Sequence, residues 1–475
     1  MPRLSPLAVA AALLLLLRPD PVAAAQWRDE GQDSPPAEAT GAVSAPPVNA
    51  SALDEWMQPA TITPEDGSSE APVQAAPTAP QVPSFDAGPS RGTEPQREQD
   101  MLSLGGLIYQ RAEFLGFQGS EGRTMQPVVP SLADVFLDVQ PSDEFRGFVR
   151  GRLLYDALDP VLSTPQATLD QFWFRFGVGR RVFFTIGRQQ LRWGSSKVWN
   201  PTDFLQEPNP RPLDALDLRT GIDMLKVNIP WEALASNLWL IATADLKGPE
   251  SQRLRYGGAV KAEVALGPSE LSLTAAFQQG RRPRYGMGWS VGAGPLDFNA
   301  ELALVRDSLA RTWQRTGEGF FERPIQGPRL LASGGVEGTF RLSDVYRANL
   351  RLEGFYNALG YEDRALLTWV RSTGDYRPLF FGRAYGLAQV RVDRRSMAEP
   401  GVGLTLLSNL SDRSFLARLD AGMSVLREVN VQAYLEMPFG ERGSEFLFEP
   451  DLSVAELPSS SHMLFRAGLG VTIRM

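Results

Sequence analysis

Apolar and polar residues alternate with a period of two along residues 101–475. From Arg347 to Asn357, every second residue belongs to a largely polar set that includes Arg351 and Glu353, and the residues between them include Leu350 and Leu352. The same alternation runs through 253–266, 383–393, 429–437 and 463–475. Because successive side chains of a strand point to opposite faces, each segment predicts a strand with one apolar and one polar wall.

The length of these segments and the nature of their polar wall distinguish two all-β classes. About 18 segments of roughly 10 to 14 residues can be placed, which is long for a soluble strand and close to a tilted bilayer path. A soluble sandwich would bury its charged faces at great cost, whereas a membrane barrel turns its apolar face to lipid and its charged face to water. We therefore expect an all-β fold: a transmembrane antiparallel up-and-down β-barrel of 16–18 strands.

The connections between predicted strands give an independent signal. Counting strands from Leu102, the connections after even-numbered strands are short, such as 140–143, 177–181, 267–270 and 341–344. Those after several odd-numbered strands are long: 194–218, 307–328, 358–381 and 438–461. Short turns at one end and long loops at the other are typical of an outer-membrane barrel with both termini in the periplasm.

Two segments precede the predicted barrel. Residues 1–25 combine Arg3, an apolar run from Leu7 to Leu17 and Ala23-Ala24-Ala25 before Gln26, which predicts a cleaved signal peptide. The alternative is an uncleaved anchor, but the apolar run is shorter than a spanning helix requires. Residues 26–100 contain 12 Pro and only three aromatic residues, which predicts a disordered acidic Pro-rich segment in the periplasm. The barrel is then 101–475.

The acidity of the chain lies in that segment. Residues 26–100 carry 13 acidic and 3 basic residues, a net of −10, while the whole chain carries −8 and residues 1–25 carry +1, so the remainder is +1. The segment could bind a periplasmic partner, with Ser51–Met57 as a docking peptide, or that short cluster could have no role. A negative chain also argues against nucleic-acid binding.

Composition excludes several enzyme classes. The chain has no Cys and one His, so disulfides, thiolate sites and multi-His metal centres are ruled out. His462 follows Ser459, Ser460 and Ser461 directly, but a catalytic triad needs groups brought together from separate elements. No glycine-rich phosphate loop joins a strand to a helix. We expect no enzyme activity, no cofactor and no metal.

The polar wall of the predicted strands is rich in arginine. Guanidinium groups stay charged and bind carboxylate or sulfate well, so this wall would favour anionic solutes through its field. Alternatively, Arg and Glu side chains on adjacent strands pair and only brace the barrel. The predicted pore-lining residues are Arg146, Arg150, Arg152, Arg175, Arg253, Arg255, Lys261, Arg347, Arg351, Glu353, Arg383, Arg391 and Arg418.

The most distinctive local stretch surrounds two tryptophans. It contains Gly187, Arg188, Gln189, Arg192, Trp193 and Gly194, then Trp199, Asn200, Pro201 and Asp203. This "GRQ, WG, then WNPTDF" pattern resembles porin-like bacterial outer-membrane β-barrels related to the alginate-export type. The resemblance implies 18 strands, an Arg-rich lumen and an inward-folded constriction loop at 194–218. The alternative is a strand-to-loop corner whose two Trp side chains cap the barrel rim.

The final strand carries a second resemblance. Residues 466–473 resemble the C-terminal signal by which bacterial outer-membrane barrels are recognised for insertion, although the last residue is Met475 and not an aromatic. The resemblance implies location in the bacterial outer membrane. It also implies contact with the barrel-insertion machinery, and with lipid and lipopolysaccharide.

Three functions follow from these expectations. The leading hypothesis is a porin-like channel whose Arg-rich lumen passes small polar or anionic solutes. The second is export of an acidic polysaccharide with a periplasmic partner. The third is a structural component of an envelope complex whose lumen is plugged.

Overall fold

The computed structural model describes residues 101–119, 122–142, 144–159, 163–179, 181–214, 216–245, 255–317, 319–394, 400–448 and 462–475. All of them belong to one compact unit. The predicted signal peptide and the predicted acidic segment lie outside the described residues. Among the described residues, no helix has the length and apolar character needed to cross a membrane.

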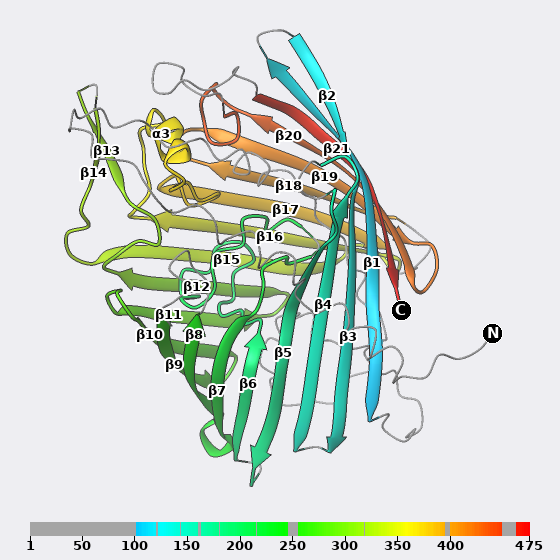
Figure 1. Cartoon of the computed structure of the whole chain (residues 1–475), viewed down its shortest axis with the longest axis vertical. Helices are drawn as coiled ribbons and strands as arrows, with labels where there is room; N and C mark the ends of the chain where they lie inside the picture. The colour runs from blue at the N-terminus through cyan, green and yellow to red at the C-terminus, as the bar shows by residue number, and fades with distance from the viewer. Residues whose placement is uncertain are drawn as a thin grey trace, which may run out of the picture. The chain divides into compact units, whose positions relative to one another are not determined.

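Strands dominate this unit (Figure 1). The first half of the barrel contains β1 (Leu102–Gly119), β2 (Gly122–Val128), β3 (Pro130–Ser142), β4 (Phe145–Asp156), β5 (Gln166–Val178), β6 (Val182–Gln189), β7 (Ile222–Trp231), β8 (Ser236–Asp245), β9 (Arg255–Leu266) and β10 (Ser269–Gln278). The second half contains β11 (Arg284–Ala293), β12 (Leu296–Val305), β15 (Arg329–Arg341), β16 (Tyr346–Asn357), β17 (Ala384–Arg394), β18 (Gly401–Asn409), β19 (Ser414–Ser424), β20 (Val429–Phe439) and β21 (His462–Arg474).

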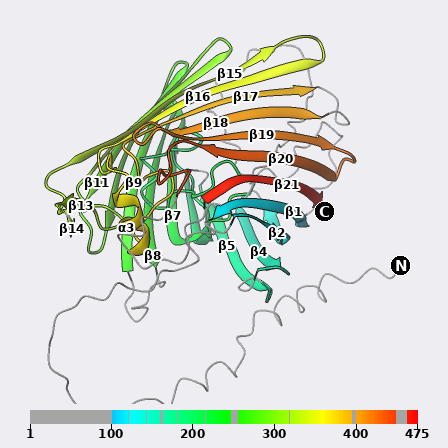
Figure 2. The same cartoon turned by 90° about the horizontal axis from the view of Figure 1, so that it is seen from above.

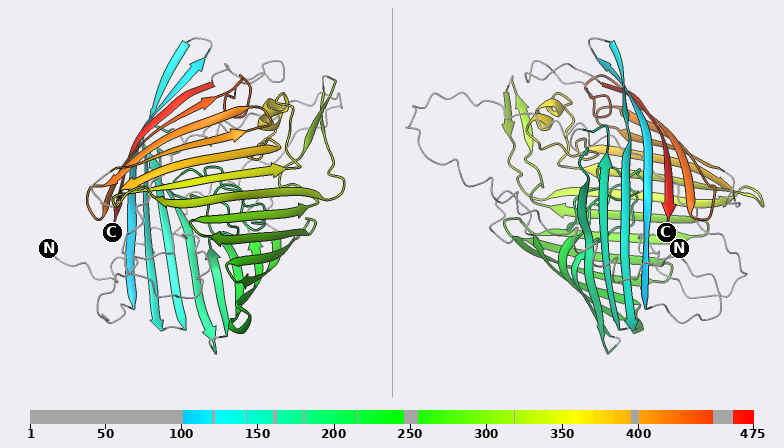
Figure 3. Two further views of the ribbon diagram at one scale, coloured as in Figure 1. Left: turned by 180° about the vertical axis from the view of Figure 1, so that it is seen from behind. Right: turned by 45° about the vertical axis from the view of Figure 1, so that its right-hand side comes forward.

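Three shorter elements lie in the connections. They are the turn of 3-10 helix η1 (Glu232–Leu234), the hairpin β13 (Trp313–Thr316) with β14 (Gly319–Glu322), and the helix α3 (Leu366–Ser372). The hairpin and α3 lie at the same end of the barrel (Figure 3).

The sheet closes into a barrel of 18 strands. Every strand pairs antiparallel with its neighbours in chain order, and β21 pairs with β1 from Leu107 opposite Arg474 to Gln118 opposite His462. The two strands lie side by side at this seam (Figure 2). β2 and β3 count as one position, because β3 pairs with residues 102–110 of β1 and β2 pairs with residues 113–119 of the same strand. The predicted fold class is confirmed.

The alternation of long and short connections is present as predicted. The connections 143–144, 179–181, 232–235, 267–268, 294–295, 342–345, 395–400 and 425–428 follow even-numbered positions and are short. The four long connections, 190–221, 306–328, 358–383 and 440–461, all follow odd-numbered positions and therefore leave the barrel at the same end. Residue 102 and residue 475 lie at the short-turn end.

The outer face of the barrel is apolar. Leu352, Leu404 and Leu469 are 54–60% exposed, and other large apolar side chains are exposed on every part of the wall. Burying such a belt in hydrocarbon is favourable and leaving it in water is not. On β16, Glu353 and Phe355 lie on the opposite face and are buried, so the interior of the barrel is not an empty bore.

Candidate functional site: the barrel interior

The connection 190–221 between β6 and β7 folds into the barrel, and we call it the inward segment. At one wall, Ser196 Oγ lies 3.3 Å from Ser333 Oγ of β15. At the other, Arg152 of β4 donates to the carbonyl of Leu218 at 3.1 Å. β4 is third and β15 twelfth of the 18 strand positions, a separation of nine, so these walls are diametrically opposite. The inward segment therefore crosses the lumen.

Glu353 of β16 anchors the middle of the inward segment. Its carboxylate accepts backbone N–H groups from Lys197 at 2.9 Å, Val198 at 3.0 Å and Trp199 at 2.8 Å. Hydrogen bonds to an ionised acceptor stabilise a folded structure more than neutral ones do, by about 1.5–3 kcal/mol each. A wall carboxylate in this role fixes the path of three consecutive residues.

Glu301 of β12 anchors the neighbouring turns. It accepts the N–H of Ser195 at 2.8 Å and the hydroxyl of Thr202 at 2.7 Å. Gly194 precedes this contact with a φ of +108°, a conformation that other residues rarely adopt. A Cβ at Gly194 would also collide with the Glu301 carboxylate and the Asn200 side chain. Gly194, the glycine of the WG pattern, thus allows the backbone of the inward segment to approach β12 closely.

Both tryptophans of the pattern are inside the barrel. Trp199 is fully buried, stacks on Phe355 with ring centroids 5.7 Å apart, and donates from Nε1 to the carbonyl of Leu379 at 3.0 Å. Trp193 is buried, and the Lys261 amine lies 5.6 Å from its ring centroid. Trp199 packs on Phe355 and Tyr385, which lie near the long-connection ends of β16 and β17, so apolar side chains of the inner wall bury it close to this rim.

The other residues of the pattern shape the same turn. Arg188 forms a bidentate pair with Asp223 of β7, at 2.9 and 2.8 Å. Asn200 accepts the N–H of Ser196 through its side chain at 3.1 Å and the N–H of Asp203 through its carbonyl at 3.0 Å. Arg192 donates to the carbonyls of Ser196 and Lys197. Gly187 on β6 has a φ of +123°. Gln189 and Pro201 are both buried.

The far end of the inward segment is fixed by charge and by apolar contact. Arg152 pairs with Asp170 of β5 at 3.2 Å while it donates to the segment's carbonyls. Leu216 and Leu218 pack against the cluster of Leu107, Tyr109 and Leu132 on β1 and β3. The segment is thus held on at least three parts of the wall.

Two carboxyl groups of the inward segment are buried. Burial raises the pKa of Asp203 to about 7 against the opposing charge of Arg219, and raises that of Asp214 to about 7 against Arg111 and Arg466. A carboxyl with a raised pKa holds its proton longer in the folded form, so its contribution to stability is present at low pH and falls as pH rises from about 4 to 7.

Most of the predicted pore-lining cations pair with acidic side chains on the wall. The pairs are Arg146–Asp138 at 2.6 Å, Arg150–Asp134 at 3.2 Å, Arg152–Asp170 at 3.2 Å, Lys261–Glu263 at 2.7 Å, Arg351–Glu337 at 3.0 Å, Arg391–Asp393 at 2.7 Å and Arg418–Asp420 at 2.8 Å. Arg383 pairs with Glu362 at 2.6 Å, but both residues lie in the connection 358–383 and not on the wall. The pairs of Arg146, Arg150, Arg152 and Arg351 join adjacent strands and so brace the barrel, whereas those of Lys261, Arg391 and Arg418 join residues of one strand. Selection of anions by these arginines stays a prediction.

Two other predicted pore-lining cations, Arg175 and Arg347, have different surroundings. The guanidinium of Arg175 lies 4.9 Å from the ring centroid of Phe183, and Arg347 is exposed at the short-turn end of β16. Arg253 lies outside the described residues, as does the side chain of Arg255. His462 begins β21, but Ser459, Ser460 and Ser461 also lie outside.

The other long connections form a cap. Trp313 donates from Nε1 to Asp375 at 2.9 Å, which joins 306–328 to 358–383. Glu445 joins 440–461 to the cap by accepting the N–H of Leu379 at 3.0 Å and the hydroxyl of Tyr385 at 2.6 Å, and burial raises its pKa to about 7. Because Leu379 also accepts the Trp199 indole, the cap and the inward segment are in direct contact.

Sequence reasoning missed Glu301, Asp170, Lys197 and Glu445. Glu301 carries a weak signal, since it is the one charged residue in the stretch from Phe298 to Val305. The other three act through contacts with distant parts of the chain, which periodicity does not show. Within the described residues, no group of three or more His, Asp or Glu side chains could hold a metal ion.

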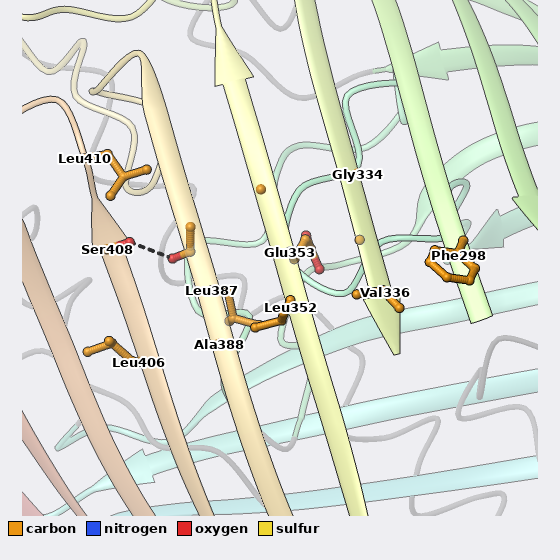
Figure 4. A pocket seen from close by; sticks show the side chains of 13 residues that line it. Phe298, Gly334, Val336, Leu352, Glu353, Leu387, Ala388, Leu406, Ser408 and Leu410 are labelled. Carbon is orange, nitrogen blue, oxygen red and sulfur yellow. Dashed lines mark hydrogen bonds between the residues drawn. The ribbon is translucent and has the colours of Figure 1, made fainter. Parts of the chain in front are cut away.

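A shallow hollow on the outer face lies behind Glu353 (Figure 4). Gly334, Gly354 and Gly386 stand side by side on β15, β16 and β17, and Leu352 and Leu410 border them. The absence of side chains at the three glycines leaves space in the apolar belt. Its apolar lining sets it apart from the polar interior.

Comparison with known proteins identifies no family. No protein-family model matches the chain, and no curated protein matches it. Solved structures that resemble it include Acinetobacter baumannii OccAB1, with 10% identity, 78% of this chain and 97% of that chain covered, and a TM-score of 0.46. A triple mutant of Rhodopseudomonas blastica porin has 10% identity, 79% and 100% coverage, and a TM-score of 0.40.

A third structure is Escherichia coli Wzi, described as an outer-membrane protein involved in group 1 capsule assembly and a carbohydrate-binding β-barrel. It has 11% identity, 78% coverage of this chain and 84% of that chain, and a TM-score of 0.47. Likeness at this level assigns no function, and the relation to the alginate-export type stays a prediction.

Proposed function

We propose that this chain is a bacterial outer-membrane channel for small polar solutes, narrowed by the inward segment. One observation carries the proposal: the segment crosses a closed barrel and is anchored by Glu301 and Glu353 on one side and Arg152 on the other. An apolar exterior suits lipid and a polar interior suits water. A fixed segment across that interior limits passage by size. The proposal includes no catalytic role.

Planar bilayers test this function directly. We expect the purified mature chain to give discrete current steps, and vesicles that contain it to swell in monosaccharides but not in large oligosaccharides. Absence of both current and swelling would overturn the channel proposal.

A second candidate is a structural envelope component with a closed lumen, and the cap favours it. Trp313, Leu367 and Val370 are buried within the long connections, so this end of the barrel has an ordered core of its own. For this candidate, the mature chain is silent and only a variant that lacks 194–218 conducts. Export of an acidic polysaccharide would require the inward segment to leave the lumen, and a periplasmic partner for 26–100 is part of that alternative.

A further inference from the structure

Lys197 combines an anchored backbone with an exposed side chain. Its N–H binds the Glu353 carboxylate at 2.9 Å, so the residue lies against the inner wall at β16, yet its side chain is exposed. Within the described residues, no acidic side chain or hydrogen-bond acceptor pairs with the Lys197 amine. An ammonium group placed in this way is available to a solute.

Two further cations surround Lys197. The Arg192 guanidinium donates to the Lys197 carbonyl at 2.8 Å, and its side chain is exposed. Arg351 lies two residues before Glu353, on the same inward face of β16, and its charge acts on Lys197. The nearby carboxylates are already engaged, because Glu353 binds backbone N–H groups and Glu337 binds Arg351. Three cations, Lys197, Arg192 and Arg351, stand against two carboxylates, Glu337 and Glu353, so the net local charge is +1.

We propose that Lys197, with Arg192 beside it, forms an anion-binding site where the inward segment lies against β16 and gives the channel a preference for anions. The ligands are small carboxylates or sulfates, which ammonium and guanidinium groups bind well. This inference rests on the proposed function. It assigns anion selectivity to the inward segment and not to the wall arginines. The charges of those arginines are largely cancelled by their partners.

Reversal potentials across a salt gradient test the site. We expect Lys197→Gln to bring the ratio of anion to cation permeability close to one, and Lys197→Arg to keep the wild-type ratio. Arg391→Gln together with Asp393→Asn is the matched control, since these two residues form an ion pair at 2.7 Å and removing both charges leaves the net charge of the lumen and the Lys197 group unchanged. An unchanged ratio in a conducting Lys197→Gln channel would overturn the inference and leave the channel proposal standing.

Chemical labelling gives a readout that needs no current. The chain has only four lysines, Lys197, Lys226, Lys247 and Lys261, so an amine-reactive reagent and mass spectrometry resolve each one. We expect sodium succinate to slow labelling of Lys197 more than sodium chloride at equal ionic strength, with Lys226 as the internal reference. Equal rates in both salts would contradict an anion site, whether or not the barrel conducts.

The pH dependence should follow the same amine. The Lys197 side chain reaches water only inside the barrel, where the surrounding protein displaces much of its hydration. This desolvation and the charges of Arg351 and Arg192 lower the pKa of Lys197 to about 8, with Glu337 and Glu353 opposing them. Because the amine is charged only below its pKa, the anion preference should fall as pH rises from 7 to 9. Lys197→Arg should show no such fall, and a wild-type preference that is constant over this range would count against the site.

Discussion

Replacing Glu301 and Glu353 together by alanine should raise the single-channel conductance several-fold. Each carboxylate holds backbone or hydroxyl groups of the inward segment, with distances of 2.7–3.0 Å for the best contacts. Losing one charge-assisted hydrogen bond costs about 1.5–3 kcal/mol, and the double variant loses several. Since 1.4 kcal/mol changes an equilibrium tenfold, the segment should leave its position for much of the time.

Glu337→Gln is the matched control for this variant. Glu337 is also an inward-facing carboxylate, but it contacts Arg351 and Asn349 of the wall and not the inward segment. The single-channel conductance of the Glu337→Gln variant should stay near the wild-type value. Wild-type conductance in the Glu301→Ala/Glu353→Ala variant would show that these carboxylates do not hold the constriction.

Removing Arg466 from the buried charges at the barrel seam should cost about 3–5 kcal/mol of unfolding free energy, because Glu113 then keeps only its longer ion pair with Arg111, at 3.1 Å. Arg466 of β21 and Glu113 of β1 pair at 2.6 Å, and both side chains are fully buried. These two strands close the barrel, so the pair lies where closure occurs. Arg466→Met should therefore lower the urea concentration at which the barrel unfolds in lipid vesicles, measured by tryptophan fluorescence.

Two further variants test whether the loss of unfolding free energy comes from the seam ion pair or from any change in the barrel wall. Arg111→Met and Glu113→Gln together with Arg466→Met remove all three buried charges and should recover part of the loss. Arg341→Gln breaks an exposed pair with Asp344 and should cost at most about 1 kcal/mol. Equal losses for the seam pair and the exposed pair would contradict this account of the seam.

The barrel itself could be predicted from the sequence, and its internal contacts could not. Strand periodicity is a local property, so the alternation from Leu350 to Glu353 shows which side chains face outward and which face the lumen without any knowledge of the neighbouring strands. Pairs such as Arg466 with Glu113 join residues 353 positions apart, and only the closure of β1 on β21 brings them together. Most neighbouring wall pairs likewise depend on strand register.

The inward segment was a prediction from resemblance and not from periodicity. The pattern from Gly187 to Asp203 located the connection that enters the lumen, but it did not identify its anchors. Periodicity places Glu353 among many wall charges, and it does not single out Glu301. Both owe their role to facing the segment across the lumen, which is a matter of tertiary packing.

Site-directed spin labelling tests most directly the claim that the barrel's outer face meets lipid and its inner face meets water. The chain has no Cys, so a single introduced cysteine is the only labelling site. Val390 is 45% exposed on the outer face of β17, and Gln389 beside it faces inward. In lipid vesicles, the account predicts that a label at Val390→Cys is accessible to oxygen and one at Gln389→Cys to a water-soluble nickel complex. Equal access of the nickel complex to both labels would contradict it.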